Sequence, residues 1–330
     1  MKARTRNSRI ELLRIGAMLL IVVLHLIQND DRLNYVLSDN SFNGACLIGL
    51  KLFANIGVSI FALITGFFGI SPSYRKLFAL VFKTWFYSVC ITLVFLLCGC
   101  SHLKELVTVM IPLNSGHWYI NAYVILIMVC SFAGDKINQV SKGQFKTWLL
   151  IGFILLYVFF WLSFDIGTNV ILVMYLYCLG RYIARFQPLM GGRLLSISLG
   201  VFILALGVLY LTRSQVILKL LGSNYSPIVL LLSVSIFMSV VFKKSIDISK
   251  VNIIAHRSLA VYLISEIHPV RKTLLALQYS FDYNVVFIVC FAISIYISCF
   301  FIDWLLSPIE TYFRNWTFHI LSIIIKKRIK

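Results

Sequence analysis

The chain has 330 residues, of which 60% are hydrophobic and only 13% are charged, and its mean hydropathy is +0.91. Soluble domains carry about 25% charged residues, so this composition excludes an ordinary soluble protein and predicts an integral membrane protein. The 30 basic and 12 acidic residues give a formal net charge of +18, which would also suit a nucleic-acid-binding protein. The distribution of the basic residues along the chain decides between the two.

Ten apolar segments approach or reach the length of about 20 residues that a helix needs to cross a bilayer. We therefore predict an all-α polytopic membrane protein with spans at 10–28, 46–70, 77–98, 118–133, 147–163, 168–184, 195–212, 226–242, 257–277 and 284–306. The ninth is the weakest, because Glu266, His268 and Pro269 interrupt it. No linker or low-complexity tract separates the spans, so residues 1–330 are expected to form a single membrane domain without a fused extracellular domain.

The basic residues favour one side of the membrane. With the N-terminus placed in the cytoplasm, 22 lysines and arginines fall in cytoplasmic segments and 7 in outer segments, with Arg14 left within a span. This asymmetry follows the positive-inside rule and predicts that both termini are cytoplasmic. The basic tail Lys326–Lys330 is expected to lie along anionic lipid headgroups. Membrane lipids, and not nucleic acid, are the expected partners of these charges.

Arg14 and His25 are the two polar residues that stand out in the first span, which is expected to be retained because no cleavage pattern follows it. Eleven residues of helix turn through about 1100° and rise about 16 Å, so both share one helix face. An arginine within hydrocarbon costs about 2.5–3.5 kcal/mol and usually marks a ligand path or an ion pair. Alternatively, Arg14 reaches the membrane interface and pairs with Glu11, while His25 does the same at the far end. The residue pattern by itself leaves both interpretations open.

Other chemistry-bearing residues give weaker signals. The cysteines lie mostly within apolar spans, and the histidines form no cluster at metal-ligand spacing. We therefore expect neither a bound metal nor a bound cofactor. Gly57, Gly66 and Gly69 in the second predicted span have the small-residue spacing that allows close helix packing.

Four stretches carry a resemblance to a known family. They are the Arg14-to-His25 spacing of an arginine, ten residues and a histidine; the segment 56–68, which ends in Thr-Gly-Phe-Phe and leads to the basic loop 74–78; the segment His-Trp-Tyr-Ile-Asn-Ala-Tyr at 117–123; and Ser-Leu-Ala-Val-Tyr-Leu-Ile-Ser-Glu at 258–266. In this order, and with ten predicted spans, they resemble the membrane-bound acyltransferase-3 family, in particular its polysaccharide O-acetyltransferase branch.

The resemblance implies an O-acetyltransferase in the plasma membrane of a bacterium. It would pass an acyl group, expected to be acetyl, from cytoplasmic acetyl-CoA as donor substrate to a hydroxyl of a cell-surface polysaccharide or lipid-linked saccharide. A hydroxyl that attacks a thioester must lose its proton, and histidine is the commonest base near neutral pH, so His25 is the candidate general base. Arg14 presents planar, permanently charged donors, suited either to the coenzyme's phosphates or to a developing oxyanion.

Further candidates follow from the other matched stretches. Arg75 and Lys76 are expected to contact the donor's phosphates, unless they are only topology-setting charges. Trp118 and Tyr119 are expected either to stack on a sugar ring at the outer face or to belong to the aromatic belt.

The fourth stretch departs from the family pattern. The family often shows Tyr-Leu-Ile-His where this chain has Tyr262-Leu-Ile-Ser265. On a continuous helix His268 would lie about 4.5 Å further along, close enough to reach back toward the space of the family histidine; the alternative makes it an interfacial residue before a helix-ending proline. Glu266 is expected to orient His25 or to bind a hydroxyl, unless it is a solvated interfacial carboxylate, and Tyr262 is a supporting candidate beside it.

A different class of function also fits intramembrane polar groups. A transporter or flippase that only moves a lipid-linked saccharide would place such groups along its pathway. Transfer of labelled acetyl from acetyl-CoA to glycan separates the two classes. A polysaccharide polymerase is less compatible, because only the outer segments 29–45 and 99–117 are of any size.

Overall fold

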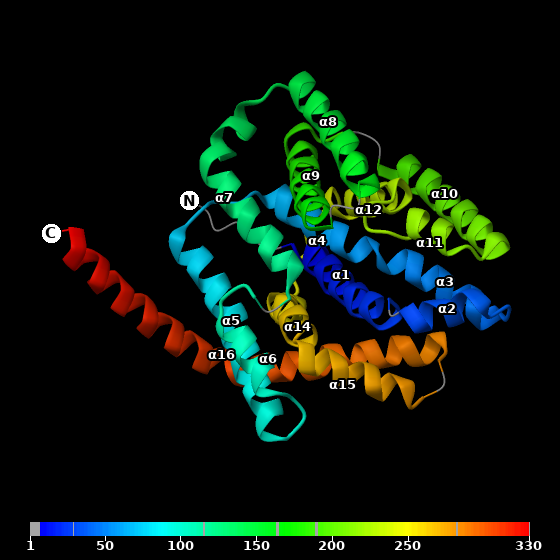
Figure 1. Ribbon diagram of the computed structural model, residues 1–330. Helices are drawn as coiled ribbons and strands as arrows, with labels where there is room; N and C mark the ends of the chain where they lie inside the picture. Colours follow the sequence, from blue (N-terminus) through cyan, green and yellow to red (C-terminus); the bar gives the residue numbers. More distant parts are fainter. Residues whose placement is uncertain are drawn as a thin grey trace.

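The structure is a computed structural model that describes residues 7–28, 30–114, 116–162, 165–188, 191–281 and 283–329. Within these residues all regular structure is helical (Figure 1). The helices are α1 (Ser8–Ile27), α2 (Asp30–Ser38), α3 (Phe42–Ala54), α4 (Ile56–Phe68), α5 (Tyr74–Leu97), α6 (Leu103–Met110), α7 (Trp118–Gln139), α8 (Lys142–Trp161), α9 (Asp165–Phe186), α10 (Gly191–Thr212), α11 (Gln215–Leu221), α12 (Pro227–Val241), α13 (Ser249–His256), α14 (Ser258–Ser265), α15 (His268–Tyr279) and α16 (Val285–Ile329).

Five helical segments in the described part of the chain are long and apolar enough to cross a membrane. They are Ser8–Ile27, Phe42–Phe68, Tyr74–Leu97, Gly192–Thr212 and Val285–Ile323, while Trp118–Gly134 and Pro227–Val241 are shorter apolar helices. The protein is thus all-helical and has the apolar helices of a membrane protein. Ten crossings with cytoplasmic termini stay a prediction.

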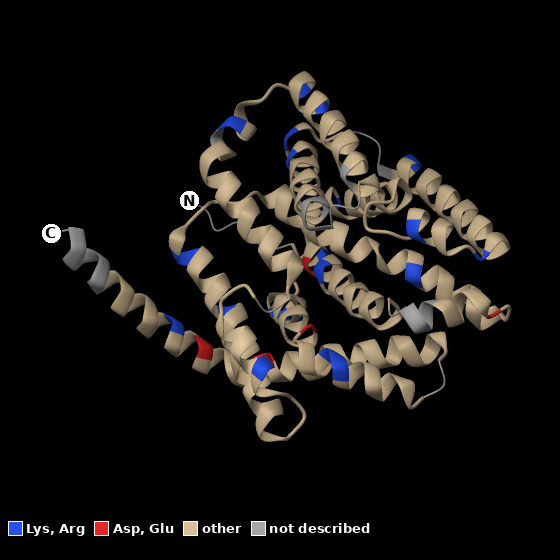
Figure 2. Cartoon of the chain, viewed as in Figure 1, with Lys and Arg blue, Asp and Glu red and all other residues tan. Residues whose placement is uncertain are grey.

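The charge distribution is consistent with a membrane-embedded bundle. Figure 2 shows that most lysines and arginines lie at or near helix ends and that acidic residues are few. Lys2, Arg4 and Arg6, which contribute to the predicted asymmetry, lie outside the described residues, as do the side chains of the basic tail 326–330.

The predicted second span corresponds to the helical segment Phe42–Phe68, in which Asn55 separates α3 from α4 while its own backbone stays helical, with φ −62° and ψ −22°. The Asn55 side-chain amide donates to the Lys51 carbonyl oxygen over 2.7 Å.

Two other predicted spans differ from the observed helices. The last continues far beyond residue 306, because α16 runs to Ile329 with Pro308 inside it. A helix of that length spans about 67 Å, more than twice a bilayer's hydrocarbon core. Its C-terminal part projects from the bundle in Figure 1, so α16 is longer than a single direct crossing requires.

The ninth predicted span is divided most strongly. Helix α14 ends at Ser265, Ile267 is extended with φ −62° and ψ 128°, and α15 begins at His268 with Pro269 in its first turn. Proline lacks the N–H that a continuing helix needs, yet it fits the first turn of a new helix. The expectation of a continuous helix from Ser265 to His268 is therefore wrong.

Helix α1 lies at the centre of the bundle (Figure 1), in contact with α3, α4, α12, α13, α14 and α16. Two glycines of α4 permit unusually close approaches to its neighbours. A Cβ on Gly57 would lie 2.6 Å from the Ala17 carbonyl oxygen of α1, and one on Gly66 would lie 2.3 Å from the Tyr177 carbonyl oxygen of α9. The expected packing role of these two glycines is confirmed, whereas Gly69 ends α4 with a φ of +75°.

One carboxylate joins α5, α14 and α16. Asp303 of α16 is 2% exposed; Lys83 Nζ donates to its Oδ1 over 2.9 Å and Tyr87 Oη over 2.5 Å, while Arg257, directly before α14, donates to its Oδ2. A buried carboxylate between two cations is strongly coupled to both, because removing it leaves their charges uncompensated.

We therefore predict that Asp303→Asn lowers the stability of the folded protein by about 3 kcal/mol or more. In detergent, the midpoint of thermal unfolding should fall by about 5 °C or more. Asp247→Asn is the matched control, because Asp247 is exposed and, among the described residues, forms no ion pair; it accepts a hydrogen bond from Asn252. Equal midpoints for the wild type and Asp303→Asn would show that this cluster does not hold the three helices together.

Candidate functional site

Arg14 and His25 lie on the same face of α1, since α1 is one uninterrupted helix from Ser8 to Ile27. Arg14 Nη1 donates to Glu11 Oε2 over 2.6 Å. Glu11 is buried and Arg14 is partly exposed, with 24% of its side chain accessible. The pairing with Glu11 agrees with one of the two interpretations of the sequence, while the position of Arg14 relative to the membrane interface stays a prediction.

His25 meets a carboxylate from a distant part of the chain. Its Nδ1 lies 2.6 Å from Glu266 Oε1, and the His25 and Glu266 side chains are 17% and 10% exposed. Arg271 Nη1 lies 3.6 Å from the other oxygen of the carboxylate, Oε2. At this distance the two groups form a close ion-pair contact, although the geometry at Nδ1 is not that of a hydrogen bond. A carboxylate beside Nδ1 favours the tautomer in which Nε2 is the proton acceptor. This is the contact that the expected orienting role of Glu266 requires, and it excludes a solvated carboxylate.

His25 lines a narrow cavity of about 20 Å³, which is room for about one water molecule. Four aromatic and four aliphatic side chains complete its wall: Phe61, Trp118, Tyr119, Tyr262, Met18, Ile21, Val58 and Leu259. Four helices, α1, α4, α7 and α14, supply these residues. The site is therefore closed to bulk water on most sides, which strengthens the electrostatic interactions within it.

Tyr119 differs from its predicted place. It is 9% exposed, and its ring packs edge-on against Phe61 and Tyr262 and parallel to Tyr123. The first turn of α7 therefore faces the bundle, and neither sugar stacking at the outer face nor an aromatic-belt role fits Tyr119. Trp118 is partly exposed and lines the His25 cavity, so it joins this cavity to the surface.

His117 is a buried residue of the site that the sequence analysis did not select. Its Nε2 lies 2.9 Å from the Leu263 carbonyl oxygen of α14, and its ring packs edge-on against Tyr262 with centroids 5.5 Å apart. His117 thereby fixes the start of α7 to the helix that carries Glu266. The signal that could have found it is its position directly before Trp118 in the third matched stretch.

His268 lies away from His25. Its side chain is 70% exposed, and its Nδ1 lies 3.3 Å from Glu105 Oε1 of α6. The hydroxyl of Ser101 donates to this carboxyl group, and this hydrogen bond lowers the pKa of Glu105. The nearby His268 lowers the pKa of Glu105 further. The break after α14 turns His268 outward, so the expectation that it fills the space of the family histidine is wrong.

Arg75 and Lys76 are exposed at the start of α5 and share no cavity with His25. The Arg75 guanidinium lies over the Phe318 ring, 5.9 Å from its centroid, and Lys76 Nζ is 3.4 Å from Ser71 Oγ. The loop before them borders a separate cavity of about 820 Å³ between α4, α7 and α9. The structure therefore does not bring these two basic residues together with Arg14 and His25.

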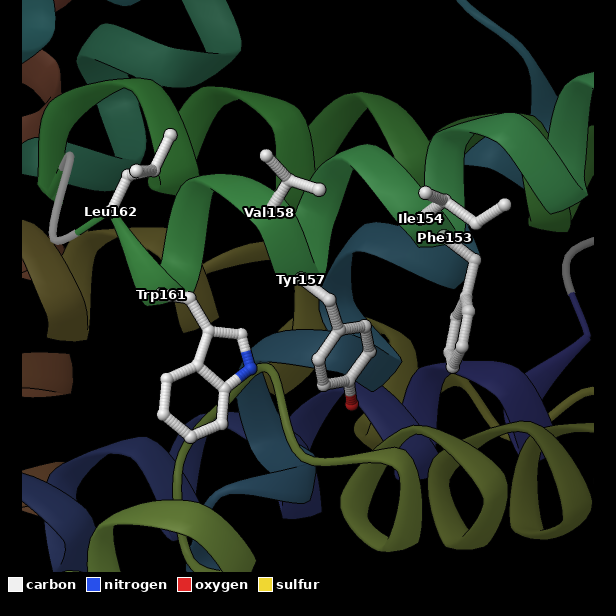
Figure 3. A pocket seen from close by; sticks show the side chains of 6 residues that line it. All are labelled: Phe153, Ile154, Tyr157, Val158, Trp161 and Leu162. Atoms are coloured by element: carbon white, nitrogen blue, oxygen red, sulfur yellow. The ribbon is translucent and has the colours of Figure 1, made fainter.

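The 820 Å³ cavity and a hollow on α8 differ in the chemistry of the residues that line them. Arg181 of α9 lines the 820 Å³ cavity and donates to Asn138 Oδ1 over 2.7 Å, so this cavity contains a cation. By contrast, a hollow of about 430 Å³ is lined by five residues of α8 and by Leu162 directly after it (Figure 3), without an ionisable group other than the phenol of Tyr157. That phenol donates to the Tyr225 carbonyl oxygen over 2.6 Å. The α8 hollow thus suits lipid chains and carries no chemistry.

The family comparison agrees with this arrangement. The sequence model described as an acyltransferase domain matches residues 7–303, which include every helix that lines the His25 cavity. The chain belongs to the acyltransferase-3 family. As an acyltransferase-3 protein it is a membrane acyltransferase. Searches of curated proteins and of solved structures found no match.

We predict that Glu266→Gln reduces the turnover number of this acyltransferase by about a hundredfold or more, because an amide can hold the wrong imidazole tautomer in place. Turnover should be measured as acyl transfer by membranes with equal amounts of protein. Glu105→Gln makes the same change in the exposed pair with His268 and should leave turnover within about twofold of wild type. Wild-type turnover of Glu266→Gln would show that the carboxylate does not orient His25.

Proposed function

We propose that this acyltransferase transfers an acetyl group from cytoplasmic acetyl-CoA to a hydroxyl of a polysaccharide or lipid-linked saccharide in the plasma membrane of a bacterium. The observation that carries the proposal is the contact between His25 Nδ1 and Glu266 Oε1 beside a narrow cavity. A histidine held in this way has its second nitrogen ready for proton transfer. The saccharide acceptor and the bacterial membrane rest on the resemblance of the four matched stretches.

The proposed reaction needs one base that later acts as an acid. His25 Nε2 removes the proton of the acceptor hydroxyl while that oxygen attacks the thioester carbonyl. The tetrahedral intermediate collapses as its carbon–sulfur bond breaks, and the His25 imidazolium returns the proton to the coenzyme A thiolate. Glu266 stabilises the imidazolium that exists between these two steps.

The size of the cavity favours a short acyl group. Met18, Val58 and Phe61 bound the space next to His25, and all three belong to well-packed helices. A long acyl chain would have to displace these side chains, and overpacking of such a core costs about 1–3 kcal/mol. Acetyl, the smallest common acyl group, needs the least displacement.

The geometry of α1 favours donor binding as the role of Arg14. Arg14 and His25 are separated by a rise of about 16 Å along one helix. This distance is too long for both side chains to contact the same thioester carbonyl group. The long, phosphate-bearing part of coenzyme A extends over such a distance, and guanidinium groups bind phosphate bidentately. We therefore assign Arg14 to the donor and not to the oxyanion.

Arg14→Lys should raise the KM for acetyl-CoA about tenfold while changing the KM for the acceptor by less than about twofold, because an ammonium group loses the bidentate geometry. Initial rates at varied donor and acceptor concentrations measure both constants. Arg75→Lys is the control at an exposed arginine at the start of α5. An unchanged donor KM for Arg14→Lys would remove Arg14 from donor binding.

His25→Ala should abolish transfer of labelled acetyl from acetyl-CoA to glycan, at a membrane abundance close to that of wild type. His268→Ala is the matched histidine control and should keep at least about half of wild-type activity, because His268 is exposed and contacts α6. Substantial acetylation by His25→Ala membranes would contradict the proposed base. Loss of activity in His268→Ala alone would reverse the assignment of the two histidines.

A further inference from the structure

The face of α1 opposite His25 borders a second, unexplained groove. Residues 9, 12, 13, 16 and 20 of α1 follow the spacing of one helix face, and Gly16 lies about 200° around the axis from Arg14. This face therefore belongs to neither the His25 cavity nor the Arg14–Glu11 pair. Any ligand here would bind at a site separate from the proposed chemistry.

The groove has a volume of about 320 Å³ and is bounded by α1, α4, α12 and the end of α3. Ten of its lining residues are apolar, and among them Gly16 forms an open floor, since a Cβ there would meet nothing within 4 Å. We call it the α1–α12 groove. Its size lies at the lower end of the range for small-molecule pockets, about 300–1,000 Å³.

The two remaining lining residues are Arg9 and Lys243. Arg9 Nε donates to the Lys244 carbonyl oxygen over 3.0 Å, which fixes the guanidinium beside the chain that follows α12. In the described part of the chain, no carboxylate forms an ion pair with either residue. An apolar groove thus carries two positive charges that form no ion pair with an acidic side chain of the described residues.

We propose that the α1–α12 groove binds one anionic phospholipid, with its phosphate between Arg9 and Lys243 and an acyl chain over Gly16. An amphiphile with a negative head and an apolar tail complements both parts of the groove. Basic pockets between transmembrane helices are typical binding sites for anionic headgroups. A zwitterionic lipid would fill the apolar part but would leave the two cations without a net counter-charge.

The test is native mass spectrometry of the purified full-length protein, titrated separately with phosphatidylglycerol and phosphatidylcholine. Wild type should retain one phosphatidylglycerol with at least about tenfold higher affinity than phosphatidylcholine. Arg9→Gln combined with Lys243→Gln should weaken phosphatidylglycerol binding about thirtyfold, as expected for two basic residues near a headgroup. Gly16→Leu should weaken it at least about tenfold, because the new side chain occupies the groove without contacting protein atoms at Cβ.

Two controls keep the result specific. Lys142→Gln combined with Lys146→Gln removes two exposed charges from α8, and Gly200→Leu adds a side chain on α10 where a Cβ also meets nothing within 4 Å. Both should bind phosphatidylglycerol as wild type does. Equal affinity for the two lipids, wild-type binding by either groove variant, or an equal loss in the α8 control would overturn the proposal and leave the groove as ordinary lipid-covered surface.

Discussion

The contact between His25 and Glu266 is the constraint on which the rest of the site depends. A carboxylate among apolar helices is stable only when it is paired or hydrogen-bonded, and Glu266 is 10% exposed with His25 on one oxygen and Arg271 near the other. The pairing requires the end of α14 to lie against the middle of the bundle beside α1. Pro269 makes this possible, because it ends the helical path after Ser265 and starts α15 in a new direction.

Helix α14 is held at both of its ends. At its start, Arg257 pairs with Asp303 of α16, which also binds Lys83 of α5. At its end, Glu266 meets α1, and α1 in turn packs closely on α4 through Gly57. Two ion clusters and one glycine contact therefore fix the position and orientation of α14 relative to α1. The position of the His25 imidazole beside Glu266 follows from them. Such preorganisation is what a proton-transfer site requires.

The periodicity of the sequence predicted features that depend only on local helix geometry. It did not predict features that depend on how the helices pack against one another. The shared face of Arg14 and His25 followed from helix geometry, and the family resemblance pointed to Glu266 as a partner for His25. The outward turn of His268 depends on where α15 starts, so hydropathy alone could not show it. The burial of Tyr119 and the contact of His117 with Leu263 depend on which helices meet α7, information that a single sequence does not carry.

Chemical rescue tests the central claim most directly. His25→Gly removes the imidazole and leaves its space beside Glu266, so added imidazole can take its place as the base. The account predicts that acetyl transfer by His25→Gly membranes is close to zero without imidazole and rises in proportion to the concentration of its neutral form, while Glu266→Gln in the same background reduces this rescue. High activity of His25→Gly without imidazole, or rescue that Glu266→Gln leaves unchanged, would contradict a base held by Glu266.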